Sequence, residues 1–453
     1  MKKFITLCAA LAWSCSASFT YAQFKEAEAE YRDFTGSNGK TVKAAIFDKT
    51  AEEVVLLLPN GKKAKVPIES LSEEDQEFIK GWSKEKSIFL EQCRSLTVRE
   101  LLELRGYESF KYKLENNSMI VDGKLNGNPA KFLIDTGAHS SVLHVQSAEE
   151  MGCKVGPMDQ VIRGIGGEAP AAWTEVGEIR LGESIIKNQR LLSADLMKDR
   201  PEGSKKTEDA IFGAEFLTQL HAVISYKEGR IFLRPDLADG EAPVAKTPEF
   251  RLFKLQNGKT FKGNIAGKTS SAVTFENEAG KKVQMAISRL SEEDKEVIDK
   301  WTPAKAAFLR YCQDLTVEEL LELRKYESFA YERRGNHIYV DGFLNETETT
   351  FMIDTGAQTT VLHIESAKDA KCEVGPLDQV IYGVGGQAPA AITKVKLVKM
   401  GTAEITNRAL ISADLFKDNP GEPSFGAIFG ADFLRELDGV ITYRESRIFL
   451  RQE

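Results

Sequence analysis

Two acidic residues, Asp135 and Asp354, stand in closely similar stretches of this chain, and these stretches offer its strongest chemistry. Each Asp follows three apolar residues and precedes Thr-Gly-Ala, and each stretch ends in Val-Leu-His. The apolar run predicts a buried strand, and a carboxylate at its end does not serve packing, because burying an unpaired charge is costly. The glycine lets the chain reverse at once. We therefore expect each stretch to hold one carboxylate on a turn whose backbone can hydrogen-bond it.

Two such carboxyl groups in contact can hydrolyse a peptide bond. Without a metal or a covalent intermediate, hydrolysis needs one group that activates water and another that protonates the leaving amine. Two carboxyl groups about 3 Å apart cannot both ionise easily, so they share a proton and divide these roles between them. Each stretch supplies one Asp, so such a site needs both stretches.

The chain contains one unit written twice, which explains the two stretches. Cys93 and Asp135 recur 219 residues later, at positions 312 and 354. Late in the unit the offset falls to 217, so that the Ile-Phe-Gly of 211–213 recurs at 428–430. Two copies of one unit allow a pseudo-two-fold arrangement within a single chain.

Asp-Thr-Gly-Ala in this setting resembles the active-site turn of aspartic proteases, specifically the single-lobe retroviral type, the retropepsins. The resemblance implies that Asp135 and Asp354 are catalytic, that the threonines tie the two turns together, and that a glycine-rich flap moves over the substrate. It also implies that an Ile-Phe-Gly element braces each catalytic loop. The residues so assigned are Thr136, Gly137, Ala138, Thr355, Gly356 and Ala357 in the turns; Gly164, Ile165, Gly166, Gly167, Gly383, Val384, Gly385 and Gly386 in the flaps; and Ile211, Phe212, Gly213, Ile428, Phe429 and Gly430 in the bracing loops.

The two copies depart from the retropepsin pattern directly after the turn, where one has His139 and the other Gln358. The family usually carries Ser, Asp or Asn there, so the difference makes the two carboxylates unequal or marks one copy as degraded. His144 and His363 recur in both copies, and we interpret them as packing or capping residues, because no cysteine or acidic cluster accompanies them. No zinc signature, phosphate-binding glycine loop or Ser-His-Asp set is present, so we expect no metal and no cofactor.

A small β-rich module opens each unit, at about residues 29–82 and 248–301. Asn60-Gly61 is a strong hairpin signal, and Ser72 with Asp75 predicts a capped helix at the module's end. These features indicate a small barrel. The Arg-x-Phe opening, the Gly-Lys turn and the Val-Pro-Ile…Leu-Ser-x-x-Asp ending resemble the Sla homology domain one, an SH3-like module. The family includes peptide-binding members, but a spacer or docking role is an equal alternative. A helical connector follows each module, and it contains a capping box of Thr97 and Glu100, which Thr316 and Glu319 repeat.

The predicted fold is mainly β, with two retropepsin-like acid-protease lobes, two small SH3-like barrels and short helical connectors. The domains expected are a signal peptide (1–22), an SH3-like module (24–83), a connector (84–106), lobe 1 (107–235), a linker (236–248), a second module (249–302), a second connector (303–325) and lobe 2 (326–453).

The first 22 residues read as a secretory signal, with Lys2 and Lys3, an apolar core to Trp13 and a small-residue site ending at Ala22. No later apolar run approaches the ~20 residues that span a bilayer. We therefore expect a protein exported to the periplasm or the cell exterior. A net charge of −8 argues against nucleic acid or an anionic membrane as the main partner.

Four cysteines remain beyond the signal and repeat between the units: Cys93, Cys153, Cys312 and Cys372. In an oxidising compartment, an even and repeated set predicts disulfides. We expect Cys93–Cys153 and Cys312–Cys372, each closing a loop of about 60 residues. The alternative is four small buried thiols.

The sequence as a whole predicts a secreted aspartic endopeptidase that acts on peptides or proteins. The two lobes of one chain are expected to pair, since a linker gives an effective concentration of order mM. This favours a monomer, and a homodimer built from two Asp135 residues is the alternative. The rival function is a non-catalytic envelope or extracellular protein whose SH3-like modules bind peptides or polymers.

Overall fold

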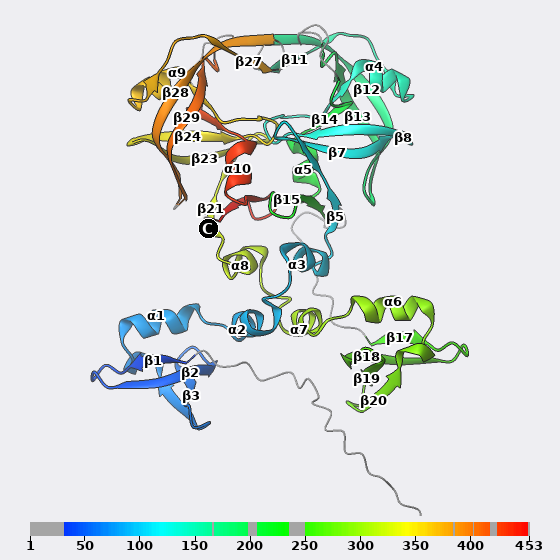
Figure 1. Cartoon of the computed structure of the whole chain (residues 1–453), viewed down its shortest axis with the longest axis vertical. Coiled ribbons are helices and arrows are strands. Elements are labelled where there is room, and N and C mark those ends of the chain that lie inside the picture. The colour runs from blue at the N-terminus through cyan, green and yellow to red at the C-terminus, as the bar shows by residue number, and fades with distance from the viewer. Residues whose placement is uncertain are drawn as a thin grey trace, which may run out of the picture. The chain divides into compact units, whose positions relative to one another are not determined.

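The computed structural model describes residues 31–164, 167–197, 206–234, 250–383, 386–401, 403–416 and 424–451. The predicted signal peptide and the predicted linker at 236–248 lie outside these ranges. The chain is mainly β and forms two compact units (Figure 1). One unit combines Met1–Cys93 with Thr247–Cys312, and the other combines Arg94–Lys246 with Gln313–Glu453. Each unit thus contains a part of both repeats, and each predicted connector is divided between the two units.

Each repeat contributes to the first unit a four-stranded antiparallel sheet that a 3₁₀ helix and an α-helix follow. A buried Phe lies at the centre of each small core, Phe34 in one module and Phe253 in the other. The identification of these modules as SH3-like stays a prediction. The elements are β1 (Arg32–Thr35), β2 (Thr41–Lys49), β3 (Glu53–Leu57), β4 (Lys63–Pro67), η1 (Ile68–Ser70) and α1 (Glu73–Gly81), and then β17 (Arg251–Lys254), β18 (Thr260–Lys268), β19 (Ala272–Glu276), β20 (Lys282–Ala286), η3 (Ile287–Arg289) and α6 (Glu292–Lys300).

The predicted cap of α1 forms, but its second residue has another partner than expected. The Ser72 hydroxyl accepts a hydrogen bond from the backbone N–H of Asp75 at 3.3 Å. The buried Asp75 carboxylate accepts from the Thr35 N–H at 2.7 Å and pairs with Arg32 at 3.0 Å. Asp75 therefore ties α1 to β1 instead of closing a capping box, and Asp294 does the same in the second module.

Short helices join the two halves of the first unit. They are α2 (Lys84–Ile88), the π-helix η2 (Phe89–Cys93) and α7 (Pro303–Tyr311), and α2 and α7 lie side by side (Figure 1). The predicted disulfides are not present, since all four cysteines are free thiols. The Cys93 and Cys312 thiols lie against each other, whereas those of Cys153 and Cys372 contact asparagines of their own lobes. The pairing within each repeat was wrong, because Cys93 lies against its matching residue Cys312, and Cys153 and Cys372 each lie beside an asparagine of their own lobe.

The second unit contains two lobes with the same topology. Each lobe contains a nine-stranded sheet. The sheet closes on itself, because its longest strand also pairs with a strand near the start of the lobe: β12 pairs with β7 in lobe 1, and β28 pairs with β23 in lobe 2. Lobe 1 consists of α3 (Val98–Leu104), β5 (Glu108–Lys111), β6 (Lys113–Glu115), β7 (Ser118–Leu125), β8 (Asn128–Ile134), β9 (Val142–His144), α4 (Val145–Glu150), β10 (Lys154–Val155), β11 (Gln160–Gly164), β12 (Gly167–Leu181), β13 (Ser184–Ala194), β14 (Ala210–Phe212), α5 (Ala214–Gln219), β15 (Val223–Ser225) and β16 (Arg230–Leu233). Lobe 2 consists of α8 (Val317–Glu322), β21 (Glu327–Ala330), β22 (Glu332–Arg334), β23 (His337–Leu344), β24 (Thr347–Ile353), β25 (Val361–His363), α9 (Ile364–Asp369), β26 (Glu373–Val374), β27 (Gln379–Gly383), β28 (Gly386–Met400), β29 (Ala403–Ala413), β30 (Ala427–Phe429), α10 (Ala431–Glu436), β31 (Val440–Thr442) and β32 (Arg447–Leu450).

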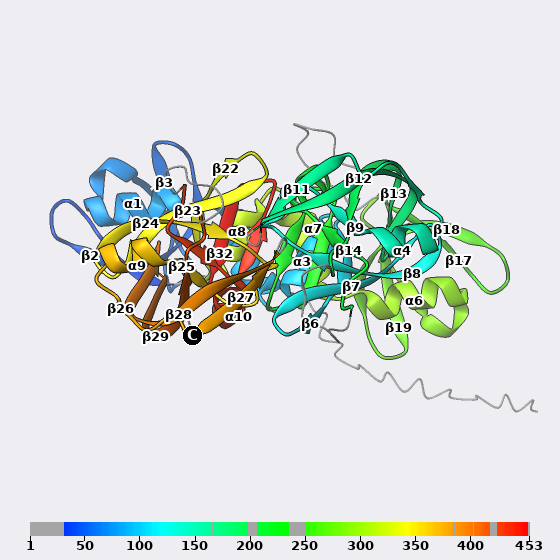
Figure 2. The same cartoon turned by 90° about the horizontal axis from the view of Figure 1, so that it is seen from above.

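A six-stranded sheet joins the two lobes, and each lobe supplies three of its strands. Its order is β21-β32-β31-β15-β16-β5, with β15 and β31 antiparallel at the centre. Ile224 pairs with Ile441 there, and both side chains are fully buried. One continuous cluster of buried residues runs through both lobes, which Figure 2 shows next to each other from above. Because they share a sheet and a core, the lobes form one folded body.

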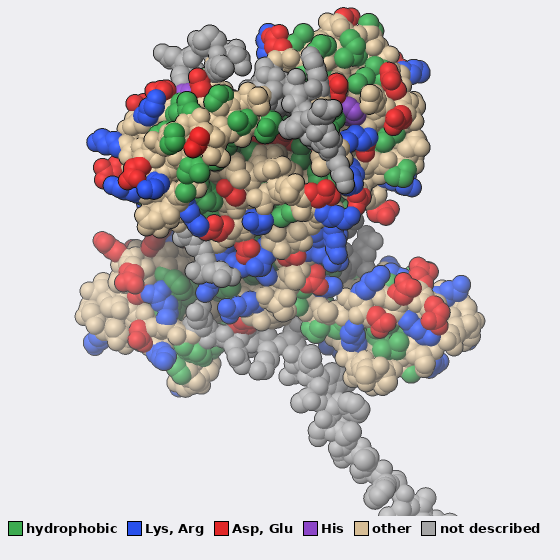
Figure 3. Space-filling view, turned by 45° about the horizontal axis from the view of Figure 1, so that its top comes forward, with side chains coloured by type: hydrophobic (Ala, Val, Ile, Leu, Met, Phe, Trp, Pro, Cys, Tyr) green, Lys and Arg blue, Asp and Glu red, His purple; other side chains and the backbone are tan. Residues whose placement is uncertain are grey.

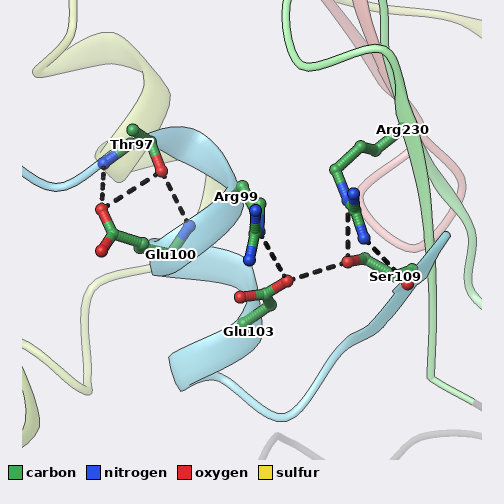
Figure 4. Close-up of polar contacts among 6 residues, drawn as sticks. All are labelled: Thr97, Arg99, Glu100, Glu103, Ser109 and Arg230. Carbon is green, nitrogen blue, oxygen red and sulfur yellow. Dashed lines mark hydrogen bonds and ion pairs between the residues drawn. The ribbon is translucent and has the colours of Figure 1, made fainter. Parts of the chain in front are cut away.

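A polar network anchors α3 to this joining sheet (Figure 4). Thr97 and Glu100 form the predicted capping box at the start of the helix. Near its end, Glu103 accepts a hydrogen bond from the Ser109 hydroxyl at 2.9 Å, and Arg230 donates to the same hydroxyl at 2.9 Å. Lobe 2 repeats the network with Glu322, Ser328 and Arg447. The repeat is therefore kept in side-chain contacts as well as in topology.

The surface mixes charges of both signs. On the face that Figure 3 presents, basic and acidic side chains alternate, without a broad area of either sign. Within the described part of the chain, no helix combines the length and the apolar character needed to cross a membrane.

Candidate active site

Strand β14 positions the Asp135 turn. It runs between β8 and β9, the two strands that flank the turn, parallel to the first and antiparallel to the second. The Phe212 carbonyl at its end accepts a hydrogen bond from the Asp135 N–H at 3.1 Å. The apolar run before the Asp thus forms the expected buried strand, and the carboxylate emerges where β8 ends.

Lobe 2 builds the same arrangement around Asp354. Strand β30 lies between β24 and β25 with the same orientations. The Phe429 carbonyl accepts from the Asp354 N–H at 3.0 Å. Two separate stretches of sequence therefore present a carboxylate in the same way.

A reciprocal set of four hydrogen bonds locks the two turns together. The Thr136 hydroxyl donates to the Ile353 carbonyl at 2.9 Å and accepts from the Thr355 N–H at 2.9 Å. The Thr355 hydroxyl donates to the Ile134 carbonyl at 3.0 Å and accepts from the Thr136 N–H at 3.1 Å. Both threonines are fully buried. Each hydroxyl therefore satisfies two backbone groups of the other lobe, which fixes the relative position of the turns.

The carboxyl groups of Asp135 and Asp354 come together above this lock and hydrogen-bond each other. One oxygen of each also accepts two backbone N–H groups of its own turn. For Asp135 these are Gly137 at 2.8 Å and Ala138 at 3.0 Å, and for Asp354 they are Gly356 at 2.7 Å and Ala357 at 3.1 Å. The second oxygen of each carboxyl is left for its neighbour or a substrate.

The contact between the carboxyls requires glycine in both turns. A Cβ at Gly137 would lie 2.5 Å from Oδ2 of Asp354, and a Cβ at Gly356 would lie 2.6 Å from Oδ2 of Asp135. Real Cβ atoms essentially never show such contacts. Each glycine thus makes room for the carboxyl of the opposite lobe.

The electrostatics of this pair favour one retained proton. Burial raises the pKa of Asp135 well above its usual range, and the charge of Asp354 and the hydrogen bond to it raise it further. The N–H groups of Gly137 and Ala138 act in the opposite direction, since they stabilise the anion. The net direction is upward, as expected where like charges share an enclosed site.

The bracing loops hold the far side of each turn. Gly213 donates its N–H to the Ser141 hydroxyl at 2.8 Å, and the Ala214 N–H donates to the Ala138 carbonyl at 3.0 Å. A Cβ at Gly213 would lie 2.8 Å from the backbone carbon of Ser140, so the loop packs tightly against the turn. Gly430 and Thr360 make the matching contact in lobe 2, at 3.0 Å.

The flap assignments are described only in part. Gly164 pairs with Gly167 at the end of the β11–β12 hairpin, and Gly383 pairs with Gly386 at the end of the β27–β28 hairpin. Both hairpins lie at the same end of the unit (Figure 1). The predicted tip residues between them, Ile165, Gly166, Val384 and Gly385, lie outside the described residues.

Sequence reasoning missed the contacts by which each lobe reaches the turn of the other. Asn336 donates its side-chain N–H to the His139 carbonyl at 2.8 Å, and Asn117 donates to the Gln358 carbonyl at 3.0 Å. The signal was present in the sequence, because these asparagines lie at the 219-residue offset (117 and 336). In the structure each directly precedes a strand, β7 or β23.

A pair of histidines lies where lobe 2 contacts the Asp135 turn of lobe 1. The His337 ring hydrogen-bonds the backbone of Gly137 and packs edge-to-face on His139, with 5.7 Å between ring centroids. Burial lowers the pKa of His337, the charge of His139 lowers it further, and Asp354 opposes this. The matching position in lobe 1 is Ser118. The surroundings of the two carboxyls are therefore unequal, and the expectation that the carboxyls themselves differ stays a prediction.

The histidines interpreted as packing residues behave accordingly. His144 and His363 are buried, and the Nδ1 of each accepts a backbone N–H, from Leu196 at 3.3 Å and from Leu415 at 3.4 Å. Among the residues that the structure describes, no group of three or more His, Cys, Asp or Glu side chains is arranged to hold a metal ion.

Comparisons with known proteins point to both lobes. Residues 121–216 match the aspartyl protease family model, and residues 340–436 match the gag-polyprotein aspartyl protease model. A retropepsin-like aspartic protease from Rickettsia conorii is 21% identical and covers 27% of this chain and 98% of its own, with a TM-score of 0.22. EIAV protease, solved with the inhibitor HBY-793, is 27% identical and covers 24% of this chain and 94% of its own, with a TM-score of 0.19. Curated proteins gave no significant match. The chain therefore carries two tandem segments, one in each lobe, that match aspartyl protease families.

Proposed function

We propose that this protein is an exported aspartic endopeptidase whose active site joins Asp135 of lobe 1 to Asp354 of lobe 2. The observation that carries the proposal is the hydrogen-bonded contact between the two carboxyls, on turns that Thr136 and Thr355 lock together. The aspartyl protease matches in both lobes support it. The substrate class is a peptide or protein.

In the proposed reaction the two carboxyls share one proton. The ionised carboxyl takes a proton from a water molecule, whose oxygen attacks the carbonyl carbon of the peptide bond. The protonated carboxyl hydrogen-bonds the carbonyl oxygen as negative charge develops there. When the C–N bond breaks, the leaving nitrogen takes a proton from the carboxyl pair, and the pair returns to its singly protonated state.

This mechanism has a defined pH dependence. Because the pKa of Asp135 is raised, the pair retains its proton above the usual range of a carboxyl group. Activity should fall as the pH rises through that raised pKa and the shared proton is lost. It should also fall at strongly acidic pH, where both carboxyls are protonated and no base remains.

The direct test is hydrolysis of denatured casein and of a peptide library from acidic to neutral pH, with and without pepstatin. We expect Asp135→Asn and Asp354→Asn each to lower the rate by roughly 10²–10⁴-fold, because either change removes one member of the pair. Asp122→Asn is the matched control, since Asp122 is an exposed carboxylate that pairs with exposed Lys113. Cleavage that survives both active-site substitutions contradicts the proposal. An absence of cleavage at every pH favours the binding alternative.

The proposed site lies within one chain, so the active species should be a monomer. Light scattering during size-exclusion chromatography gives the mass of the active peak, and specific activity should not change on dilution. Activity confined to a dimer would favour a site made from two Asp135 residues. We also propose export, and sequencing the N-terminus of protein recovered outside the cytoplasm should then begin at Gln23.

A further inference from the structure

Two buried cysteines of the first unit lie against each other. Cys93 ends the π-helix η2, and Cys312 follows the last residue of α7. Both side chains are completely buried. The two thiols lie within interaction range of each other, and the contact with Cys93 is the first cause of a raised pKa for the Cys312 thiol. The two sulfur atoms therefore face each other in an enclosed site.

The surroundings of this pair are symmetric, which shows that the contact is part of the fold. The Cys93 thiol donates to the carbonyl of Ala304, and the Cys312 thiol donates to the carbonyl of Glu85, each at 3.5 Å. Ala304 lies 219 residues after Glu85 (85 and 304), so the two contacts are the same contact made in opposite directions. Each thiol thus reaches across to the helix of the other repeat.

The other two cysteines lack this arrangement. Cys153 and Cys372 are half-buried, and each sulfur lies 3.4 Å from the side-chain nitrogen of an asparagine in its own lobe, Asn126 or Asn345. Burial raises the pKa of both thiols. They offer a matched pair of controls that occupy equivalent places in the two lobes and do not face each other.

We propose that Cys93 and Cys312 form a disulfide that joins the two repeats covalently. The oxidant is a disulfide of low molecular mass, such as oxidised glutathione, or a protein that carries a reactive disulfide. One cysteine thiolate attacks the oxidant and releases one thiol. The second cysteine then attacks the mixed disulfide, and its sulfur forms the new bond as the second thiol leaves. The two cysteines lose two protons and two electrons, and the oxidant takes up both.

Burial of the two thiols determines when this exchange can take place. The thiolate is the attacking species, and both thiols are enclosed in the folded unit. Exchange therefore takes place during folding, or when the contact between η2 and α7 opens. Once formed, the bond is shielded from reductants by the same burial.

The bond would have a specific consequence for the whole chain. Arg94 and Gln313, the residues directly after the two cysteines, begin the two segments of the unit that contains Asp135 and Asp354. The bond would hold the starts of these segments together and would keep lobe 1 and lobe 2 linked if the chain were cut between them. The proposed disulfide and its effect do not depend on protease activity.

The experiment uses the full chain with a site-specific protease recognition sequence inserted between Asp236 and Thr247. The protein is refolded in a mixture of reduced and oxidised glutathione, cut at the inserted site, alkylated and run on a denaturing gel. We expect one band of full size without reductant and two bands with it. Peptide mapping of the uncut, unmutated chain should show Cys93 joined to Cys312 and should show alkylated Cys153 and Cys372.

Two matched variants complete the test. Cys153→Ser with Cys372→Ser should keep the halves joined, whereas Cys93→Ser with Cys312→Ser should let them separate. Separation of the unmutated halves without reductant overturns the proposal. Pairing of Cys93 with Cys153 also overturns the proposal, because both cysteines lie on the same side of the cut and the halves would separate. A peptide map in which all four cysteines are alkylated overturns the proposal as well. If the second variant does not fold, the peptide map of the unmutated chain still decides.

Discussion

In lobe 1 the Asp-Thr-Gly-Ala turn is followed by His139, against which His337 of lobe 2 packs. In lobe 2 the turn is followed by Gln358, and the residue of lobe 1 that matches His337 is Ser118. The hydrogen bonds that hold the carboxyls and join the turns do not differ in this way. Each lobe supplies one Thr that bonds two backbone groups of its partner, and one Gly that makes room for the opposite carboxyl.

The comparison separates two kinds of requirement. A contact across the pseudo-two-fold axis must be matched by both lobes, because the same group donates on one side and accepts on the other. Side chains beside the turns are free to differ. We infer that the shared frame is needed for the proposed reaction itself, and that the unequal neighbours tune stability and pH response.

The largest expected effect comes from filling the space that the glycines leave. In Gly137→Ala the new methyl group would overlap the Asp354 carboxyl, and in Gly356→Ala it would overlap that of Asp135. Displacing one carboxyl by about 1 Å is expected to lower kcat/KM by roughly 10²-fold. Peptide hydrolysis measures this, and both variants should lose a similar factor.

Gly81→Ala is the control for this change, since nothing lies within 4 Å of its Cβ position. It should retain full activity. If Gly137→Ala and Gly356→Ala differ tenfold or more in kcat/KM, the symmetric description of the frame is wrong.

The threonine lock should give the next largest effect, on stability. Thr136→Val and Thr355→Val each remove one donor and one acceptor and leave buried backbone groups of the other lobe without a partner. Each is expected to lower the free energy of unfolding by about 2–4 kcal/mol. Urea unfolding at neutral pH measures the change.

Serine at these positions keeps the hydroxyl and serves as the control. Thr136→Ser and Thr355→Ser should therefore lose much less stability than the valine variants. Equal losses for serine and valine would show that packing of the methyl group contributes as much as the hydrogen bonds, and a larger loss for serine would show that packing dominates.

The histidine pair should produce a smaller effect that depends on pH. Because the pKa of His337 is lowered in the folded protein, protonation favours the unfolded state. This contribution to stability is complete above the unperturbed value of about 6.5 and declines as the pH falls from there through the lowered pKa. His337→Ser removes it and gives lobe 2 the residue of lobe 1.

The measurement is the difference in free energy of unfolding between about pH 7.5 and about pH 5. Several groups face this pair, namely His139, Asp354 and the backbone of Gly137, and the carboxyls titrate in the same experiment. Only the difference between His337→Ser and the unmutated protein is therefore interpreted, and we expect the variant to lose less stability on acidification. His139→Gln should act in the same direction, since it removes the neighbouring imidazole. If the free energy of unfolding of His337→Ser depends on pH as that of the unmutated protein does, His337 has no role in this pH dependence.

Much of this site could be predicted from the sequence, because its central residues repeat at a fixed offset. The two Asp, the two Thr and the two Gly lie in identical tetrapeptides, and an identical setting in two copies predicts a symmetric contact. The cysteines obey the same offset, yet their predicted pairing was wrong. The offset identifies matching positions, but it does not show that matching positions lie next to each other across the axis, as Cys93 and Cys312 do.

The division of the chain could not be predicted for a related reason. Sequence order places each small module before its own lobe, and the connectors show no change in composition where the units divide. The units nevertheless divide after Cys93 and after Cys312, so that the modules of both repeats fall in one unit and both lobes in the other. Contacts between repeats decide this, and a single sequence carries no direct signal for contacts between two copies of the same pattern.

The smallest expected effect comes from the acidic residue that supports each turn, Glu215 in lobe 1 and Asp432 in lobe 2. Asp432 accepts the Thr360 N–H and hydroxyl at 2.8–3.0 Å. Glu215 likewise hydrogen-bonds the Ser141 N–H and hydroxyl, but its second buried oxygen has no partner among the described residues. Burial raises the pKa of Glu215, so its contribution to stability is present at low pH and is lost as the pH rises through that pKa.

Glu215→Gln should therefore raise the free energy of unfolding by about 1 kcal/mol at neutral pH and change it little near pH 4, where the unmutated side chain is also neutral. Asp432→Asn should do the opposite at neutral pH, because it takes an acceptor from Thr360. Thermal unfolding of both variants at the two pH values measures the contrast. If both substitutions shift stability in the same direction, the two supports are equivalent, and the difference between the lobes is confined to the histidine pair.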